Sequence, residues 1–206
     1  MKKKRIFAFF LAAASCLSLA VGASAANVTR KAADFRDFDK SVWYAEAVST
    51  GVDNGLLYGK SATTLDPGGH LTRAEMAAVV NRSFGCYKAA DISRYKDVSG
   101  GKWYYNDIAL AVQMGTYNGR SASAMMPDAP ITRQEAMTVV ARALELDYDS
   151  YSQTDLSKFA DAKDASSWAL PYIRAMVGAG YIRGRGMVLA PQDNITRAEF
   201  AQIFHN

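Results

Sequence analysis

Three arginines stand at the same place in a repeated block, and their side chains could bind an anion. They follow the threonine of the pattern Leu/Ile-Thr-Arg-x-Glu, at Arg73, Arg133 and Arg197. The threonine and the glutamate have the spacing of a capping box, which predicts a helix start in each block. Each arginine then occupies the first helical position, where the helix dipole disfavours a cation by about 0.3–1 kcal/mol. We therefore interpret the arginines as ligands for an anion bound at the helix end, such as a carboxylate.

The alternative is that each arginine pairs with an acidic residue of its own chain, for which the sequence offers Asp37, Asp97 and Asp161. Each of these aspartates belongs to an aromatic-x-Asp pattern that opens a repeat. They are expected to be structural caps or arginine partners, with binding of sugar hydroxyls as a second role. The threonine and glutamate of the block need no ligand to explain them, because a helix cap contributes about 0.5–2 kcal/mol.

A glycine followed by a basic residue lies between the aspartate and the arginine of each repeat. The pairs are Gly59-Lys60, Gly119-Arg120 and Gly184-Arg185. Glycine permits a positive φ and a close approach of a ligand to the backbone, and the neighbouring cation would add a second charge for the same anion. Solvated loop charges are the alternative interpretation, and the sequence does not decide between the two.

One tryptophan per repeat starts the first predicted helix, at Trp43, Trp103 and Trp168. The indole could stack on the apolar face of a sugar ring, or it could anchor the helix in the core. On the sequence alone we favour packing, because a tryptophan at a helix start with apolar residues at helical spacing behind it is more often a core residue.

These landmarks recur three times, so the chain is built from three similar units. The threonines of the block are 60 and 64 residues apart, and the longer interval includes a polar stretch, 146–158, that is interpreted as a linker. Each unit is predicted to contain two helices joined by an irregular loop. The first helix of the first unit should run from Trp43 to about Asn54, and the second helices should begin at Thr72, Thr132 and Thr196. The predicted repeats are 31–90, 91–154 and 155–206.

One unit of this size would bury little surface, so the three are expected to share a core. The predicted fold is mainly α, with three helix-loop-helix repeats in a pseudo-threefold spindle around a central three-helix bundle. Equivalent grooves would then lie between neighbouring repeats. A linear solenoid of helix pairs is the competing arrangement.

Residues 1–25 have the pattern of a secretory signal peptide, with basic residues at 2–5, an apolar run and the cleavage motif Ala-Ser-Ala at 23–25. The whole chain has 24 Lys+Arg against 20 Asp+Glu, a formal charge of +4. Four of the cations and none of the acids lie in this segment, so the exported chain is expected to have no net charge. A neutral chain argues against a nucleic-acid partner, and no membrane association is expected after cleavage.

No catalytic or metal-binding constellation stands out in the sequence. A glycosidase needs an oriented pair of carboxylates, whereas the acids here recur as parts of the repeat. Cys86 is the one cysteine beyond the signal segment, so it is expected to be a partly buried structural thiol without an internal disulfide partner. Two histidines, His70 and His205, are too far apart in sequence to suggest a metal site. We therefore predict a protein that is not an enzyme and needs no cofactor or metal.

Together, the aromatic-x-Asp opening, the tryptophan, the Gly-x-x-x-Gly stretch, the proline and the Thr-Arg-x-Glu block resemble the S-layer homology domain over about residues 31–206. The resemblance implies a three-lobed helical spindle that attaches exported proteins non-covalently to the bacterial cell wall. Its implied ligand is a secondary cell-wall polysaccharide carrying ketal-linked pyruvate, or modified peptidoglycan in some diderm relatives. The arginine of the block is implied to contact the ligand, and the tryptophan to lie at the groove wall.

The resemblance thus predicts a secreted protein of the cell wall or surface layer that binds an anionic polymer in grooves between its repeats. A second hypothesis is a structural surface-layer protein that acts mainly by assembling with other surface proteins.

Overall fold

The computed structural model describes residues 30–85 and 87–206, so the predicted signal peptide and Cys86 lie outside the described residues. Within the described ranges the chain forms six α-helices and three short 3-10 helices, with isolated β-bridges and no longer strand. The α-helices are α1 (Ala45–Asp53), α2 (Arg73–Phe84), α3 (Tyr105–Gln113), α4 (Arg133–Ala143), α5 (Leu170–Gly178) and α6 (Arg197–His205). The 3-10 helices are η1 (Ala32–Asp34), η2 (Tyr148–Tyr151) and η3 (Ala162–Asp164). The mainly helical prediction is confirmed, and none of the helices in these ranges is both long and apolar enough to cross a membrane.

The second helix of each repeat begins where the capping box predicts. The hydroxyl of Thr72 accepts a hydrogen bond from the Glu75 N–H at 3.2 Å, and the Glu75 carboxylate accepts one from the Thr72 N–H at 2.9 Å. The same reciprocal bonds start α4 and α6. The first helices begin two residues later than predicted, so that Trp43 precedes α1 rather than opening it. Gly55, with a φ of 70°, follows the end of α1 as a C-terminal stop.

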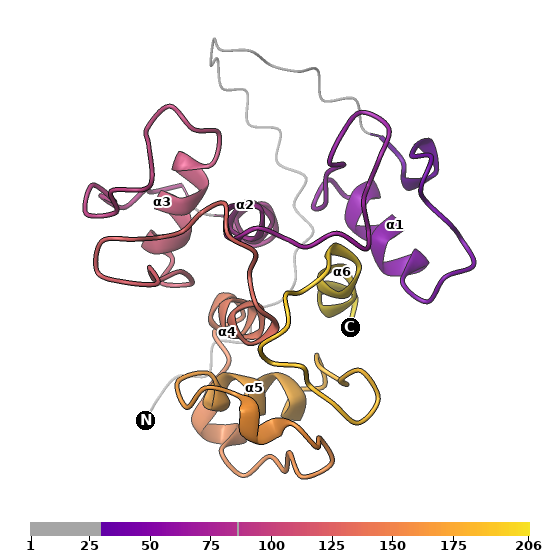
Figure 1. Ribbon diagram of the computed structural model, residues 1–206, viewed down its shortest axis with the longest axis vertical. Helices are drawn as coiled ribbons and strands as arrows, with labels where there is room; N and C mark the ends of the chain where they lie inside the picture. Colours follow the sequence, from indigo (N-terminus) through magenta and orange to yellow (C-terminus); the bar gives the residue numbers. More distant parts are fainter. Residues whose placement is uncertain (1–29, 86) are drawn as a thin grey trace, which may run out of the picture.

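The inner helices α2, α4 and α6 lie nearest the centre of the molecule, and α1, α3 and α5 lie outside them (Figure 1). Each inner helix packs mainly on the outer helix of the next repeat: α2 on α3, α4 on α5, and α6 on α1. The inner helices are buried on most sides, as the short apolar residues of α2, Ala74, Ala77 and Ala78, allow. Each helix pair is therefore formed between repeats and not within one.

Backbone hydrogen bonds close the three repeats into a ring. The N–H of Leu71 donates to the carbonyl of Ile195, that of Ile195 to Ile131, and that of Ile131 to Leu71, at 3.0–3.2 Å. All three side chains are fully buried. A linear solenoid would leave the first and third repeats apart, so that alternative is wrong.

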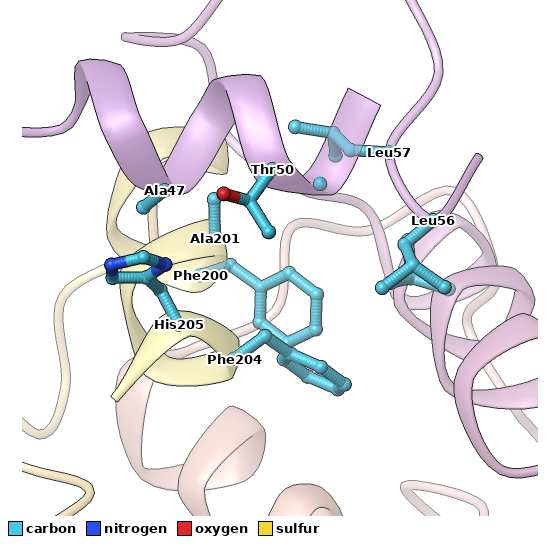
Figure 2. A pocket seen from close by; sticks show the side chains of 10 residues that line it. Ala47, Thr50, Leu56, Leu57, Phe200, Ala201, Phe204 and His205 are labelled. Carbon is cyan, nitrogen blue, oxygen red and sulfur yellow. The ribbon is translucent and has the colours of Figure 1, made fainter. Parts of the chain in front are cut away.

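The contact between α6 and α1 completes the ring with apolar side chains. Figure 2 shows Phe200 and Phe204 of α6 below α1, opposite Ala47 and Thr50. They line a small, partly open hollow of about 30 Å³ whose walls are almost wholly apolar. A hollow of this size holds little more than one water molecule and is too small for a sugar.

The polar stretch 146–158, interpreted from the sequence as a linker, is docked on the third repeat. It contains η2, which packs against α5. The ring of Tyr148 lies edge-on to Tyr172, with centroids 5.4 Å apart, and Arg174 donates to the carbonyl of Thr154 at 2.5 Å. Contacts of aromatic and charged side chains thus hold this polar segment against α5.

Candidate functional site

Three grooves lie where the repeats meet, and each collects residues from all three repeats. We number them by the repeat that supplies the Gly-basic loop. Groove 1 includes Gly59, Lys60, Glu75, Trp103 and Arg197; groove 2 includes Gly119, Arg120, Glu135, Trp168 and Arg73; groove 3 includes Gly184, Arg185, Glu199, Trp43 and Arg133. Their volumes are about 300, 470 and 530 Å³. The arginine comes from the repeat before the loop and the tryptophan from the repeat after it.

The arginine of the capping block forms the floor of each groove and holds the loop of the next repeat. In groove 2 the Arg73 side chain is 5% exposed. It donates to the carbonyls of Met125 at 2.8 Å and Asn118 at 2.9 Å, and to the carboxylate of Glu135 at 3.1 Å. The guanidinium therefore satisfies buried acceptors of the second repeat from the first turn of α2.

The other two floor arginines are held in the same way. Arg133 donates to the Leu189 carbonyl at 2.8 Å and pairs with Glu199 at 3.2 Å. Arg197 donates to the carbonyls of Leu65 and Tyr58. The predicted alternative, pairing with the aspartates of the repeat openings, is wrong within the described residues, because the acidic partners of Arg73 and Arg133 are capping-box glutamates of the following repeat. Cross-repeat contacts thus explain the arginine at a helix start.

The basic residue after the glycine contacts the same glutamate from the other side. Lys60 pairs with Glu75 at 2.6 Å, Arg120 with Glu135 at 2.9 Å, and Arg185 with Glu199 at 2.5 Å. The structure thus brings a block arginine and a loop cation together, but from different repeats, with a carboxylate of the protein between them in grooves 2 and 3.

The grooves are locally positive although the predicted exported chain is neutral. Each is lined by three basic residues and one glutamate. Burial opposes ionisation of Glu199, but hydrogen bonds from Arg185 and the Thr196 backbone and the charge of Arg133 outweigh it and lower its pKa to about 2. The pKa values of Glu75 and Glu135 are lowered by the corresponding contacts against the same opposing effect of burial. All three glutamates are therefore ionised at neutral pH, and each groove keeps a surplus of positive charge.

The lowered pKa of Glu199 predicts an acid-sensitive fold. Its carboxylate stabilises the folded state fully above its ordinary pKa of 4.5, and this contribution is lost as the pH falls toward 2. The loss should reach about 2–3 kcal/mol. Denaturant unfolding of Glu199→Gln should therefore differ from the parent most at neutral pH and least near pH 2. The exposed Glu145, which makes no ion pair among the described residues, serves as the control, and a Glu199→Gln curve parallel to that of Glu145→Gln would contradict this assignment.

Each loop needs glycine mainly because there is no room for a Cβ atom, and less because of the backbone φ angle. A Cβ on Gly119 would lie 2.4 Å from the Tyr95 ring and 2.6 Å from the Ser121 carbonyl, and Gly59 is enclosed similarly. Only Gly184 of the three has the positive φ that the sequence analysis expected, at 82°. The small residue lets the loop pass over the aromatic side chain that opens its repeat.

The three tryptophans are exposed at the groove walls. Trp43, Trp103 and Trp168 have 66%, 63% and 49% of their surface accessible. The interpretation favoured on the sequence alone, that they anchor the first helix in the core, is therefore wrong. Trp43 and Trp103 instead rest edge-on against Tyr44 and Tyr104, at 5.2 and 5.4 Å. Their free faces offer an apolar surface beside the cations.

The aspartates of the repeat openings hold the loop before each proline. Asp161 accepts hydrogen bonds from the N–H groups of Leu189 at 2.8 Å and Ala190 at 2.7 Å. Asp37 and Asp97 make the same pair of bonds in the other repeats. The second residue of each pair has a positive φ although it is not glycine: Asp66, Met126 and Ala190, at 50–55°. The structure gives these aspartates a role in the turn, and a role in sugar binding stays a prediction.

The positive φ of Ala190 predicts a stabilising substitution. A left-handed conformation costs a residue with a Cβ about 1–2 kcal/mol. We expect Ala190→Gly to raise the free energy of unfolding by about 0.5–1 kcal/mol, measured by urea denaturation. Ala89→Gly is the control, because Ala89 is exposed and lacks a positive φ. No gain from Ala190→Gly relative to that control would show that the turn carries no strain.

Three groove arginines were missed by the sequence analysis as ligand candidates. Arg82 lines groove 1 and Arg142 lines groove 2, each ten residues after the capping threonine, and Arg183 lines the loop side of groove 3. The shared offset of Arg82 and Arg142 was a signal that could have identified them. The same offset in the third repeat falls on Asn206.

Comparison with known proteins matches all three repeats. A family model for the S-layer homology domain covers residues 34–77, 94–137 and 158–201. The surface-layer 125 kDa protein of Lysinibacillus sphaericus is 36% identical over 201 residues, which cover 95% of this chain and 16% of that protein. An exoglucanase of Acetivibrio thermocellus is 30% identical over 182 residues, 87% of this chain and 16% of that protein. A cellulosome-anchoring protein of the same organism is 31% identical over 163 residues, 76% of this chain and 36% of that protein.

Proposed function

Because the chain belongs to the S-layer homology domain family, we propose that it is an exported cell-surface protein that binds an anionic polymer of the bacterial cell wall non-covalently. The observation that carries the proposal is that every groove joins a surplus of positive charge to an exposed tryptophan. Cations attract the acidic substituent, and the indole face packs against the apolar face of a sugar ring. The names of the surface-layer and cellulosome-anchoring relatives support the same role.

The finer proposal is that the acidic substituent is a pyruvate ketal on a secondary cell-wall polysaccharide. In groove 2, Arg73 and Arg120 both donate to Glu135, so their positions and orientations are fixed before a ligand arrives. A carboxylate held rigidly by a sugar ring would bind such a fixed pair with little loss of freedom. The guanidinium N–H groups that make no hydrogen bond within the protein can donate to the ligand. Modified peptidoglycan carrying an acidic group is the other wall polymer that fits.

Three grooves on one rigid ring suit a polymer with repeated acidic groups. Each groove need bind only weakly, because engaging one raises the effective concentration of polymer at the next. The backbone bonds that close the ring fix the spacing of the grooves. We infer that wall attachment depends on several grooves at once and not on one strong site.

Sedimentation with purified cell walls tests this function directly. The mature chain, residues 26–206, should sediment with walls and stay in solution without them. Concentration-dependent assembly in the absence of wall material, with no binding to walls, would support the structural surface-layer role instead. We expect no turnover of wall polymer, since the match to the exoglucanase covers 16% of that enzyme.

A further inference from the structure

Groove 2 contains an arginine whose guanidinium N–H groups have no acceptor among the described residues. Arg142 of α4 lines the groove, and its guanidinium lies 4.8 Å from the centre of the Tyr172 ring. Within residues 30–85 and 87–206 its guanidinium makes no hydrogen bond and no ion pair. Arg73 and Arg120, by contrast, share the carboxylate of Glu135. Stacking on Tyr172 orients the Arg142 guanidinium and leaves its N–H groups able to donate to a ligand.

The position of Arg142 separates it from the inner cations. Glu135 and Arg142 are seven residues apart on α4, which is two helical turns or about 10 Å along the axis. Thr138 and Val139, which lie between them on the same helix face, also line the groove. Groove 2 thus has an inner charged end at Glu135 and an outer one at Arg142, whose backbone positions are two helical turns apart on α4.

Within the described residues, neither of the other grooves has an unpaired cation at the position equivalent to Arg142, although the loop of groove 3 contributes Arg183. The equivalent Arg82 in groove 1 donates to the carbonyl of Leu56 at 3.0 Å and stacks on Tyr58 at 4.2 Å. Burial lowers the pKa of Arg82, and the interactions with Tyr58 and Asp107 oppose that shift. In groove 3 the equivalent position is Asn206, which donates to the Tyr181 carbonyl at 3.0 Å. The three grooves are therefore chemically unequal at their outer ends.

We propose that Arg142 forms an outer anion subsite, so that groove 2 binds two consecutive sugar residues that each carry an acidic substituent. The inner cations take the substituent of the first residue, and Arg142 takes that of the second. A carboxylate or a phosphate on the second sugar meets the same requirement. This inference rests on the proposed function. It predicts that groove 2 binds a polymer with acidic groups on consecutive sugars more tightly than a polymer with isolated acidic groups.

The test isolates groove 2 by disabling the other two. Trp43→Ala and Trp103→Ala remove the exposed walls of grooves 3 and 1 and leave Trp168 in place. The probes are fragments of purified wall polysaccharide with one acidic sugar or with two consecutive ones. Calorimetric titration should show tighter binding of the two-residue fragment. Arg142→Gln in this background should weaken that binding about tenfold, since a hydrogen bond to a charged group is lost, and change binding of the one-residue fragment less than about twofold.

Matched variants distinguish a ligand contact from a packing effect. Arg94 also stacks on a tyrosine, at 4.6 Å from Tyr95, but lies outside the three grooves, so Arg94→Gln should not change binding of either fragment. Arg142→Lys keeps the charge and should restore part of the preference for two residues. Equal losses for both fragments, or no loss with Arg142→Gln, would overturn the outer subsite. Failure of the unmodified chain to bind either fragment would instead overturn the proposed function.

Discussion

Replacing Trp43, Trp103 and Trp168 together with alanine is expected to weaken binding to purified walls by about 10³-fold. Truncating an aromatic side chain that carries binding energy in an interface costs about 1.4 kcal/mol or more, which is roughly tenfold in affinity for each groove. The three losses multiply because the grooves act on one polymer. All three side chains are at least 49% exposed in the free protein, so their removal leaves the core intact. The free energy of unfolding should therefore fall by less than about 2 kcal/mol.

Wall sedimentation and denaturant unfolding measure the two halves of this prediction on the same variant. Tyr87→Ala is the control, because Tyr87 is a fully exposed aromatic residue outside the three grooves. It should change neither binding nor stability. Unimpaired binding by the folded triple variant would show that the indoles do not contact the polymer.

Arg73→Ala is expected to lower the free energy of unfolding by about 3–5 kcal/mol, the usual cost of removing one partner of a buried ion pair. The substitution leaves the carbonyls of Met125 and Asn118 and the carboxylate of Glu135 without their shared donor. All three acceptors lie in the second repeat, so the loop of that repeat should lose its attachment to α2. Denaturant unfolding followed by circular dichroism gives the measurement.

Two further variants show whether the shape of the guanidinium matters. Arg73→Lys keeps the charge but not the planar fork, so it should lose an intermediate amount of stability. Arg94→Ala removes an exposed arginine and should cost less than about 1 kcal/mol. Equal stability of Arg73→Ala and Arg94→Ala would contradict the role of Arg73 in the groove floor. Loss of wall binding by Arg73→Ala has to be interpreted together with this loss of stability.

Local features of the fold were predictable because they depend on residues close in sequence. The capping box needs only Thr72 and Glu75, three residues apart, and it places the start of α2 correctly. The glycine stop after α1 is equally local, since Gly55 has the positive φ that ends a helix. The repeat itself indicated that the grooves would be related, and each groove does contain one predicted arginine, glycine, loop cation and tryptophan, whereas the predicted aspartates line none of them.

Which repeat supplies which groove residue could not be predicted, because that depends on contacts far apart in sequence. Arg197 reaches the loop of the first repeat, 132 residues from its partner Leu65. The aspartates that the sequence offered as alternative partners instead accept hydrogen bonds from backbone N–H groups before each proline. The tryptophans were misjudged for a related reason: the apolar pattern behind Trp43 belongs to α1, which begins only after it.

Titration of residues 26–206 with purified wall polysaccharide, before and after removal of the pyruvate ketals from the polysaccharide, tests the central claim most directly. The ketal carboxylate is the group that the inner cations of each groove are proposed to bind. We predict that the intact polysaccharide binds and that the treated polysaccharide binds at least about tenfold more weakly, as expected when a charge-assisted contact is lost. Equal affinity for the two preparations would contradict anion recognition in the grooves.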